Sequence, residues 1–523
     1  MNWGICLIRS RLALYLVVIG LVGLLVACSS EATPATPTAA VTPAASPTAS
    51  PTNTPIPLKL LNIEPVTGYI GDPFTVTGEG LTPNKEVELV WATVDGSYVN
   101  QASAESVLFH ERKFVEKRVS LGSATTDAQG RFSATVTAPE DYGEVHDIYA
   151  IVDGKDAARG GFRILRTATI TPTKGPVGTP ITITVKGISV KSYENTMALR
   201  YDNKYTGFVT AVTTRGTAIF QIRAAGPPGQ HTIQVSGASP GTPYLNLQQS
   251  PVAHVPMDFK WVFTVTEDNG PPPDSLEWPD MDHTALASEA IPRTTAGSVL
   301  AAPGASAALE PASGPILSQA TLYANGLPSN TEVELFWVTA RGNRLSPSGW
   351  GLYETSLLKT SPAQDGSLTA SFQVPDGLGG WHVVRVGQGD KVLAEAPYFV
   401  ERSLVGVTPK RVKAGEIFTV QVKGIGWTEL DNGVAVTYDN AYIGYACGFN
   451  SNGDVTITLV ATGGPGTHLI DLYPMIYHGG RSISQAKELW NYEIPFLTFV
   501  QDFPGLELGY ALPAFRLAIE VVE

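Results

Sequence analysis

The chain has 523 residues, of which 43% are hydrophobic and 16% are charged. This apolar content excludes an intrinsically disordered chain, and the length is enough for three or four domains. The net charge of −13 and the lack of a basic stripe exclude nucleic acid as an expected partner. With 52 glycines and 39 prolines, the composition favours many short strands joined by tight turns.

The N-terminal segment predicts export from the cytoplasm. Two arginines precede an apolar run at residues 12–27, which is shorter than the roughly 20 residues that a membrane-spanning helix needs. The run ends in LVAC, which resembles the lipobox of bacterial lipoproteins, and this implies a signal peptide at residues 1–27 and lipidation of Cys28. The alternative is an uncleaved membrane anchor. Both place the remainder outside the cytoplasm, anchored to the membrane in the envelope or on the cell surface.

Two cysteines remain once the signal peptide is removed. Cys28 would be acylated, so Cys447 has no partner for an internal disulfide, and apolar cores alone must hold the domains together. The surrounding sequence YIGYACGF favours a small buried strand residue at 447, with a reactive thiol as the alternative.

Residues 28–57 are rich in threonine and proline and lack the apolar residues that a core needs. Proline favours extended polyproline II structure at about 3.1 Å per residue, so this stretch is expected to be a disordered tether of roughly 90 Å. Its serine and threonine residues are possible sites of O-glycosylation, which composition does not decide.

Internal repeats dominate the rest of the chain. The sequence LTPNKEVELVW at residues 81–91 returns as LPSNTEVELFW at 327–337, and ALRYDNKYTGF at 198–208 returns as AVTYDNAYIGY at 435–445. These offsets indicate a duplicated pair of domains, A-B followed by A′-B′. The predicted boundaries are A at 58–166, B at 167–266, a linker at 267–308, A′ at 309–402, and B′ with a C-terminal closing strand at 403–523.

Each unit is expected to consist of strands. Segments such as ITITV, TIQVS and FTVQV alternate apolar and polar residues, and turn signals recur every 8–12 residues. Residues 201–205, YDNKY, predict a tight hairpin, because Asp and Asn tolerate positive φ angles. No long segment with helical periodicity follows Cys28. The predicted fold class is all-β, with four tandem immunoglobulin-like β-sandwich domains after a signal peptide and a disordered Thr/Pro-rich linker.

These repeats resemble bacterial immunoglobulin-like domains. B and B′ are similar to the IPT/TIG type in their opening proline-glycine strand, their central hairpin and their final PPGQHTIQV or GPGTHLIDL strand. A and A′ resemble a looser relative through GLTPN, DAQGRF and TAP. The resemblance covers residues 60–265 and 309–500. It implies a β-sandwich fold and says little about function, since such domains have many roles.

The predicted linker contains a cluster of acidic residues at 267–282, for which a Ca²⁺-binding loop is the alternative interpretation. The prolines in this stretch and the lack of regular ligand spacing favour a solvated linker.

One motif is typical of an enzyme. Residues 237–241 match G-x-S-x-G, but Pro240 follows Ser239 and has no N–H to donate to an oxyanion. No zinc, phosphate-loop or dinucleotide motif occurs, and no carboxylate pair is singled out for glycoside hydrolysis. We therefore expect no catalytic residue, no metal and no cofactor, and we expect that the protein is not an enzyme.

Aromatic residues are the better candidates for binding. Trp350 and Tyr353 lie in SPSGWGLYET, where A has an unrelated sequence, so we expect a loop tip. Exposed aromatic faces there would suit contact with a glycan or a surface protein. Partial burial of the two rings in the local core is the favoured interpretation, and ligand binding is the alternative. Trp91 and Trp337 each end an EVEL strand and are expected in the cores of A and A′. The turn context of Trp427 allows exposure, and nothing else in the sequence supports it.

Four of the eight histidines recur once per domain. Each follows a glycine by two or three residues and opens an alternating strand. A metal ligand or a catalytic base has no need of a copy in every domain, so we expect a structural role at the start of one late strand in each sandwich. Metal binding or catalysis is the alternative. These residues are His146, His231, His382 and His468.

The sequence thus favours a non-enzymatic lipoprotein that displays immunoglobulin-like domains for adhesion or for glycan or protein binding. A structural or accessory scaffold component of the envelope is the first alternative, and an extracellular hydrolase is the least favoured.

Overall fold

The computed structural model divides the chain into Met1–Pro57 and Leu58–Glu523, and all described residues lie in the second unit. Cys28, the signal peptide, the tether, Ser239 and Pro240 lie outside them, as do the side chains at 102 and 350. The described residues are 58–102, 107–191, 194–238, 241–245, 259–279, 302–342, 350–477, 494–497, 502–509 and 511–523.

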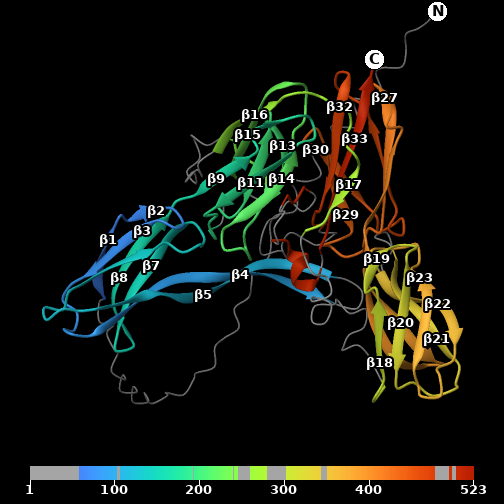
Figure 1. Ribbon diagram of the computed structural model, residues 1–523, viewed down its shortest axis with the longest axis horizontal. Coiled ribbons are helices and arrows are strands. Elements are labelled where there is room, and N and C mark those ends of the chain that lie inside the picture. The colour runs from blue at the N-terminus through green and yellow to red at the C-terminus, as the bar shows by residue number, and fades with distance from the viewer. Residues whose placement is uncertain are drawn as a thin grey trace, which may run out of the picture. The chain divides into compact units, whose positions relative to one another are not determined.

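Sandwich A packs the sheet β1-β3-β6 against the sheet β5-β4-β7-β8, and β1 pairs with a strand of each sheet. Strands β4 and β5 form a hairpin that runs far beyond the neighbouring strands (Figure 1). The strands are β1 (Lys59–Glu64), β2 (Thr67–Gly68), β3 (Pro73–Gly78), β4 (Glu86–Ala102), β5 (Val107–Thr125), β6 (Phe132–Thr137), β7 (Glu144–Val152) and β8 (Lys155–Ile164).

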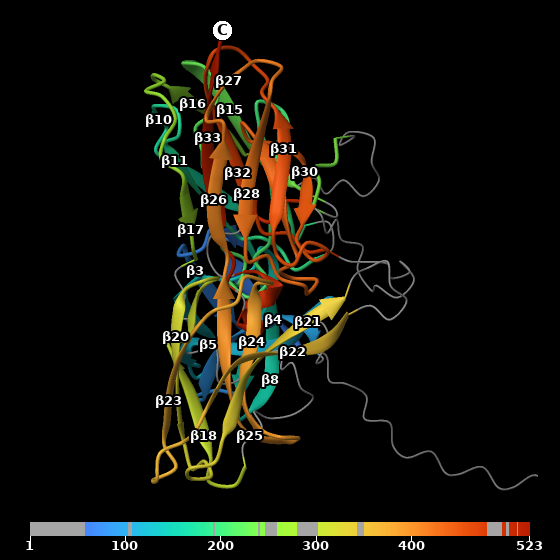
Figure 2. The same ribbon diagram turned by 90° about the vertical axis from the view of Figure 1, so that its right-hand side faces the viewer.

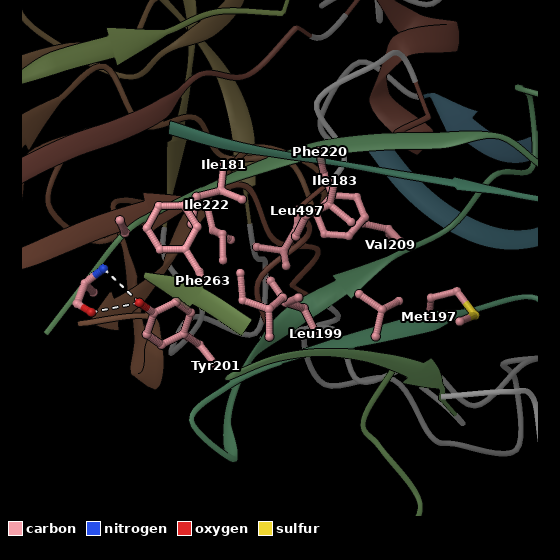
Figure 3. Close-up of a cluster of buried hydrophobic side chains, with 14 of the residues drawn as sticks. Ile181, Ile183, Met197, Leu199, Tyr201, Val209, Phe220, Ile222, Phe263 and Leu497 are labelled. Atoms are coloured by element: carbon pink, nitrogen blue, oxygen red, sulfur yellow. Dashed lines mark hydrogen bonds between the residues drawn. The ribbon is translucent and has the colours of Figure 1, made fainter. Parts of the chain in front are cut away.

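Sandwich B packs β14-β11-β9 against β10-β16-β15-β12-β13. Figure 3 shows its core, where Ile183 and Phe220 of one sheet meet Leu199 of the other. Leu497, from a distant part of the chain, inserts into the same cluster. The strands are β9 (Thr167–Thr171), β10 (Lys174–Gly175), β11 (Pro180–Lys186), β12 (Met197–Tyr201), β13 (Lys204–Val209), β14 (Ala218–Arg223), β15 (Gly229–Gly237) and β16 (Phe259–Val265).

Sandwich A′ packs β18-β20-β23 against β19-β25-β24-β21-β22. The hairpin of β21 and β22 continues past the end of β24, as Figure 2 shows. The strands are β18 (Ser306–Glu310), β19 (Ser313–Pro315), β20 (Gln319–Asn325), β21 (Val333–Gly342), β22 (Trp350–Thr360), β23 (Leu368–Gln373), β24 (Gly380–Gln388) and β25 (Lys391–Glu401).

Sandwich B′ packs β26-β28-β31 against β17-β33-β32-β29-β30, and β27 pairs with β33. Helical structure among the described residues is confined to the 3-10 turn η2 (Pro504–Leu508), and no described helix is long and apolar enough to cross a membrane. The strands are β17 (Ser275–Glu277), β26 (Ser403–Thr408), β27 (Arg411–Lys413), β28 (Ile417–Lys423), β29 (Gly433–Tyr438), β30 (Ala441–Cys447), β31 (Val455–Val460), β32 (Gly466–Tyr473) and β33 (Ala514–Val522).

Two expectations concern the ends of B′. The closing strand predicted at the C-terminus is confirmed, since β33 pairs with β32 along its length. The stretch predicted as a linker differs in part, because β17 pairs with β33 and belongs to B′. The reason is side-chain packing: Leu276 contacts the B′ core, and Glu277 accepts a hydrogen bond from Arg516 Nε at 2.8 Å. Composition alone reveals neither contact.

Two local features repeat between the sandwiches, and the first of them is the hairpin turn that the sequence predicts. The hairpin turn between β12 and β13 has Asp202 and Asn203 at φ angles of 48° and 61°, and Asp439 and Asn440 repeat it at 46° and 60°. Both residues of each turn are left-handed, which is the conformation of a type I′ turn. Each sandwich also has one cis proline near the end of its first strand, at Pro65, Pro172, Pro311 and Pro409.

An apolar cluster outside the four cores combines side chains of all four sandwiches, and we call it the junction cluster. The far end of the β4–β5 hairpin supplies Tyr98 and Phe109, and the segment before β33 supplies Phe496 and Phe503. Its buried members are Tyr98, Val107, Phe109, Phe208, Val212, Trp381, Phe399, Leu430, Ile476, Ile494, Phe496, Phe503 and Leu512.

Asp502 lies within this cluster and is 1% exposed. Its carboxylate accepts hydrogen bonds from the Tyr98 hydroxyl at 3.2 Å, the Thr210 hydroxyl at 2.6 Å and the Val212 N–H at 2.9 Å. The N–H and hydroxyl of Thr213 donate two more, at 2.8 and 2.9 Å. A buried carboxylate is stable only with such partners. Asp502 therefore ties A, B and the C-terminal segment together.

Candidate functional site

The four recurrent histidines occupy one structural position. Each is the third residue of its strand, in β7, β15, β24 and β32, which confirms the predicted location. In each case Nε2 lies close to the backbone carbonyl four residues earlier. A carbonyl oxygen can only accept a hydrogen bond, so this nitrogen carries a proton in all four. The distances are 2.7 Å for His146, 2.8 Å for His231, 2.8 Å for His382 and 2.9 Å for His468.

The partner of the second ring nitrogen differs between the two kinds of sandwich. In A and A′, Nδ1 faces a backbone carbonyl, at 3.0 Å for His146 and 3.3 Å for His382. In B and B′, Nδ1 of His231 and of His468 lies 2.6 Å from the carboxylate of the hairpin aspartate. That aspartate also accepts from the backbone of the histidine strand, so the pair joins the hairpin turn to this strand.

Burial and charge move the pKa values of His382 and His468 in opposite directions. Complete burial lowers the pKa of His382 to about 4, so its imidazole is neutral at pH 7. Burial also lowers that of His468, but the hydrogen bond and the negative charge of Asp439 outweigh it and raise the pKa above 6.5. These differences follow from local partners in each sandwich and require no ligand.

Each histidine ring also packs on an aromatic ring of its own sandwich. Trp91 and Trp337 stack on His146 and His382 with centroids 4.5 and 4.7 Å apart. Both tryptophans are buried, as the sequence predicts. In B and B′ a hairpin tyrosine replaces the tryptophan, at 5.5 and 5.4 Å. Each sandwich thus engages one ring face and the Nε2–H of its histidine in internal contacts, and in B and B′ the hairpin aspartate also engages Nδ1.

The predicted binding residues of A′ lie in a strand. Trp350 opens β22 and Tyr353 is its fourth residue, whereas the sequence favours a loop tip. Tyr353 is 38% exposed, and the guanidinium of Arg341 on β21 lies 3.7 Å from its ring centroid. Leu352 beside it is 37% exposed. The side chain of Trp350 lies outside the described part of the chain.

Two other sequence expectations require correction. Trp427, whose turn context allows exposure, is only 6% exposed, because it packs on His382 at the place where A′ meets B′. Cys447, expected to be buried, is half-buried at the end of β30. It lies on an edge strand, where a neighbouring strand covers only one side.

No protein-family model matches the chain, and no curated protein matches it. Among solved structures it is similar to the ICAM-5 D1–D4 ectodomain fragment, with 10% identity over 88% of this chain and 99% of that chain and a TM-score of 0.18. For invasin, a bacterial integrin-binding protein, the identity is 11% over 79% of this chain and 76% of that chain, with a TM-score of 0.19.

The chain is also similar to a Salmonella alpha-2-macroglobulin mutant, with 9% identity over 80% of this chain and a TM-score of 0.16. The chain spans 29% of the length of that protein. Identities and TM-scores this low do not allow functions to be transferred. The sheets described above give the fold directly. The described residues form four tandem immunoglobulin-like sandwiches.

The described residues contain no group of three or more His, Cys, Asp or Glu that could hold a metal ion. Ionisable side chains are instead buried between sandwiches. Arg223 of B forms an ion pair with Asp471 of B′ at 2.6 Å, and both side chains are at most 5% exposed. Arg516 lies 3.5 Å from the same aspartate. Sequence inspection does not find this group, because its members are up to 293 residues apart in the chain.

Proposed function

We propose that the protein is a non-enzymatic lipoprotein outside the cytoplasm, held in the membrane through Cys28, which displays its sandwiches for binding a glycan or a surface protein. The lipobox and the Thr/Pro-rich tether support the anchor, and the proline-glycine openings of B and B′ support the IPT/TIG type. The recurrent histidines, which are the natural candidates for chemistry, are engaged in internal hydrogen bonds.

One observation favours a particular binding surface. Tyr353 and Leu352 are exposed on β22, an edge strand of its sheet, and Arg341 lies over the tyrosine ring. An aromatic ring with a guanidinium beside it offers apolar contact area together with hydrogen-bond donors, which suits glycans and protein loops. We assign the binding surface to this hairpin of A′.

A scaffold role in the envelope is the second candidate, and the junction cluster favours it. Asp502 and thirteen buried apolar residues fasten four sandwiches to one another, which would let the chain act as a stiff spacer. In that case, the partner would contact broad polar faces of the sandwiches, and the hairpin of A′ would not be a specific binding surface.

Binding of the full chain to a glycan array and to a panel of cell-surface proteins separates these candidates. We expect at least one ligand whose affinity falls tenfold or more in Tyr353→Ala. Tyr323→Ala is the matched control, because Tyr323 is 43% exposed on β20 of the opposite sheet of A′. The assignment to the hairpin fails if Tyr353→Ala binds like the wild type. A wild-type chain without any ligand in both screens would favour the scaffold.

Trp350→Ala extends the same screen to the residue that the sequence singles out beside Tyr353. Anchoring needs a separate measurement. Cys28→Ala should move the protein from the membrane fraction to the soluble fraction and abolish incorporation of labelled fatty acid. Membrane retention of this variant without labelling would instead support an uncleaved anchor.

A further inference from the structure

The two domain pairs meet through the same backbone contact. We call the contact of Tyr142-Gly143 in A with residues 187–191 in B the A–B elbow. Its repeat is the contact of Leu378-Gly379 with residues 424–428, the A′–B′ elbow. The Gly143 N–H donates to the Ile188 carbonyl at 3.3 Å, and the Gly379 N–H donates to the Ile425 carbonyl at 3.1 Å.

Glycine is required on one side of each elbow. A Cβ atom at Gly143 would collide with the carbonyl of Gly187, and one at Gly379 would collide with that of Gly424. Backbones approach this closely only where a side chain is absent. Both pairs therefore have the same close backbone contact between their two sandwiches. The elbows differ in the side chains around this contact.

The A′–B′ elbow is filled by an indole ring. Trp427 forms a small buried cluster with Ala340 and Leu378, and its ring centroid lies 5.3 Å from that of His382. Since Trp337 stacks on the same imidazole at 4.7 Å, three rings follow one another here. His382 is completely buried as a result.

The A–B elbow has a cavity at the equivalent place. The repeat places Val94, Tyr142 and Val190 where A′–B′ has Ala340, Leu378 and Trp427, and all three line a cavity of about 280 Å³. His146 also borders this cavity, while Trp91 stacks on its ring at 4.5 Å. The first two rings of the stack are thus present, and open space replaces the third.

The larger side chain of Tyr142 does not close this space. Its hydroxyl donates to the Val212 carbonyl, and its ring packs edge to face on Phe114 with centroids 5.9 Å apart. Both contacts hold the tyrosine against the β4–β5 hairpin and the B sandwich. The volume that Trp427 occupies in one elbow is therefore not recovered in the other, because Val190 is too short.

We propose that the cavity at the A–B elbow binds a planar aromatic ring of about the size of indole. The volume is near the lower end of the roughly 300–1,000 Å³ of small-molecule sites, which suits one ring system. The lining side chains include three acids and three bases, so the site favours an uncharged ring. Charged groups at the rim already have partners, as in the Lys117–Asp95, Arg118–Asp156 and Glu144–Arg163 ion pairs.

The ring can come from two sources, a free aromatic compound or an aromatic side chain of a partner protein. Isothermal titration of the full chain with indole tests the first source, and titration with N-acetyltryptophanamide tests the second. Cyclohexylmethanol, which is apolar but not planar, is the control ligand. We expect one equivalent of an aromatic probe to bind, at least tenfold more tightly than the control.

Reciprocal variants assign binding to the elbow. Val190→Trp introduces the ring that the second pair carries and should reduce indole affinity at least tenfold. Trp427→Val opens the second elbow and should raise the stoichiometry from one to two. Because Trp427→Val retains the first site, it remains informative if Val190→Trp does not fold.

Three results would overturn the proposal. The first is that the wild type binds neither aromatic probe at millimolar concentrations. The second is that cyclohexylmethanol binds as tightly as the aromatic probes. The third is that Val190→Trp folds and binds indole with unchanged affinity. This test is independent of the proposed binding surface on the A′ hairpin, because Tyr353 does not line the A–B cavity. Tyr353→Ala should therefore bind indole like the wild type.

Discussion

The indole of Trp427 lies 5.3 Å from the imidazole of His382, at the position where the first pair of sandwiches carries Val190. The two elbows share their backbone hydrogen bonds, and they also differ in Tyr142 for Leu378 and Val94 for Ala340. The contact of Trp427 with His382 converts an open cavity into a packed core, and it determines how deeply the neighbouring histidine is buried.

We expect Trp427→Val to lower the free energy of unfolding of the A′–B′ pair by about 3 kcal/mol, because a buried ring is lost and a cavity remains. Trp427→Phe should cost less, since a ring remains and the indole N–H has no hydrogen-bond partner among the described residues. Val190→Ala is the matched control and should cost about 1 kcal/mol or less, because Val190 borders a cavity. Differential scanning calorimetry measures all three. A loss in Trp427→Val no larger than that in Val190→Ala would contradict the packing role.

A second prediction concerns the protonation of His382. Its pKa is lowered to about 4 by burial, whereas an unfolded chain takes up this proton near pH 6.5. The folded state therefore loses stability as the pH falls from 6.5 towards 4, by roughly 3 kcal/mol in total. NMR titration should show the His382 ring signals constant from pH 8 to pH 5. A midpoint near 6.5 in the folded protein would refute the assignment.

His468 should show the opposite pH dependence. Its pKa is raised, so the ion pair with Asp439 stabilises B′ fully below pH 6.5, and this contribution is lost as the pH rises through the folded pKa. Asp439→Asn removes the charge and should move the NMR midpoint of His468 to lower pH. Asp454→Asn is the control, because Asp454 is exposed and pairs with Lys423. Equal midpoints in the wild type and Asp439→Asn would show that Asp439 does not determine the charge state.

These histidines illustrate what the sequence can predict. Local patterns and the internal repeat predict the common position of the histidines. They also predict the hairpin turn at Asp202 and Asn203 and the burial of Trp91 and Trp337. Such features depend on residues that are neighbours in one strand or turn. The alternation of apolar residues likewise predicts the sandwiches, because burial of one face of each sheet is a local property of the strand.

The contacts between sandwiches could not be predicted in this way. Trp427 lies in a sequence typical of a turn, and its burial depends on Ala340 and Leu378 of another sandwich. Strand β17 depends on pairing with β33, more than two hundred residues later. In both cases the deciding partner is remote in sequence, and a single sequence carries no signal that connects the two.

The last prediction concerns Asp502, which fastens A and B to the C-terminal segment. Asp502→Asn keeps the size of the side chain, but its amide group can accept at one oxygen only. Several of the five donors that now face the carboxylate would lose their partner, at a cost of about 1–3 kcal/mol each where they stay buried. We therefore expect faster amide hydrogen exchange at Val212 and Thr213, with little change in the strands of A′.

Asp376→Asn is a suitable control, because Asp376 is an exposed carboxylate whose ion pair with Lys423 is open to water. Hydrogen exchange followed by mass spectrometry on the full chain compares the two variants. If Asp502→Asn exchanges like the wild type around β13, the carboxylate is not what holds the segment in place, and the apolar side chains of the junction cluster suffice. Faster exchange limited to Asp502→Asn would show that one buried charge couples the first two sandwiches to the end of the chain.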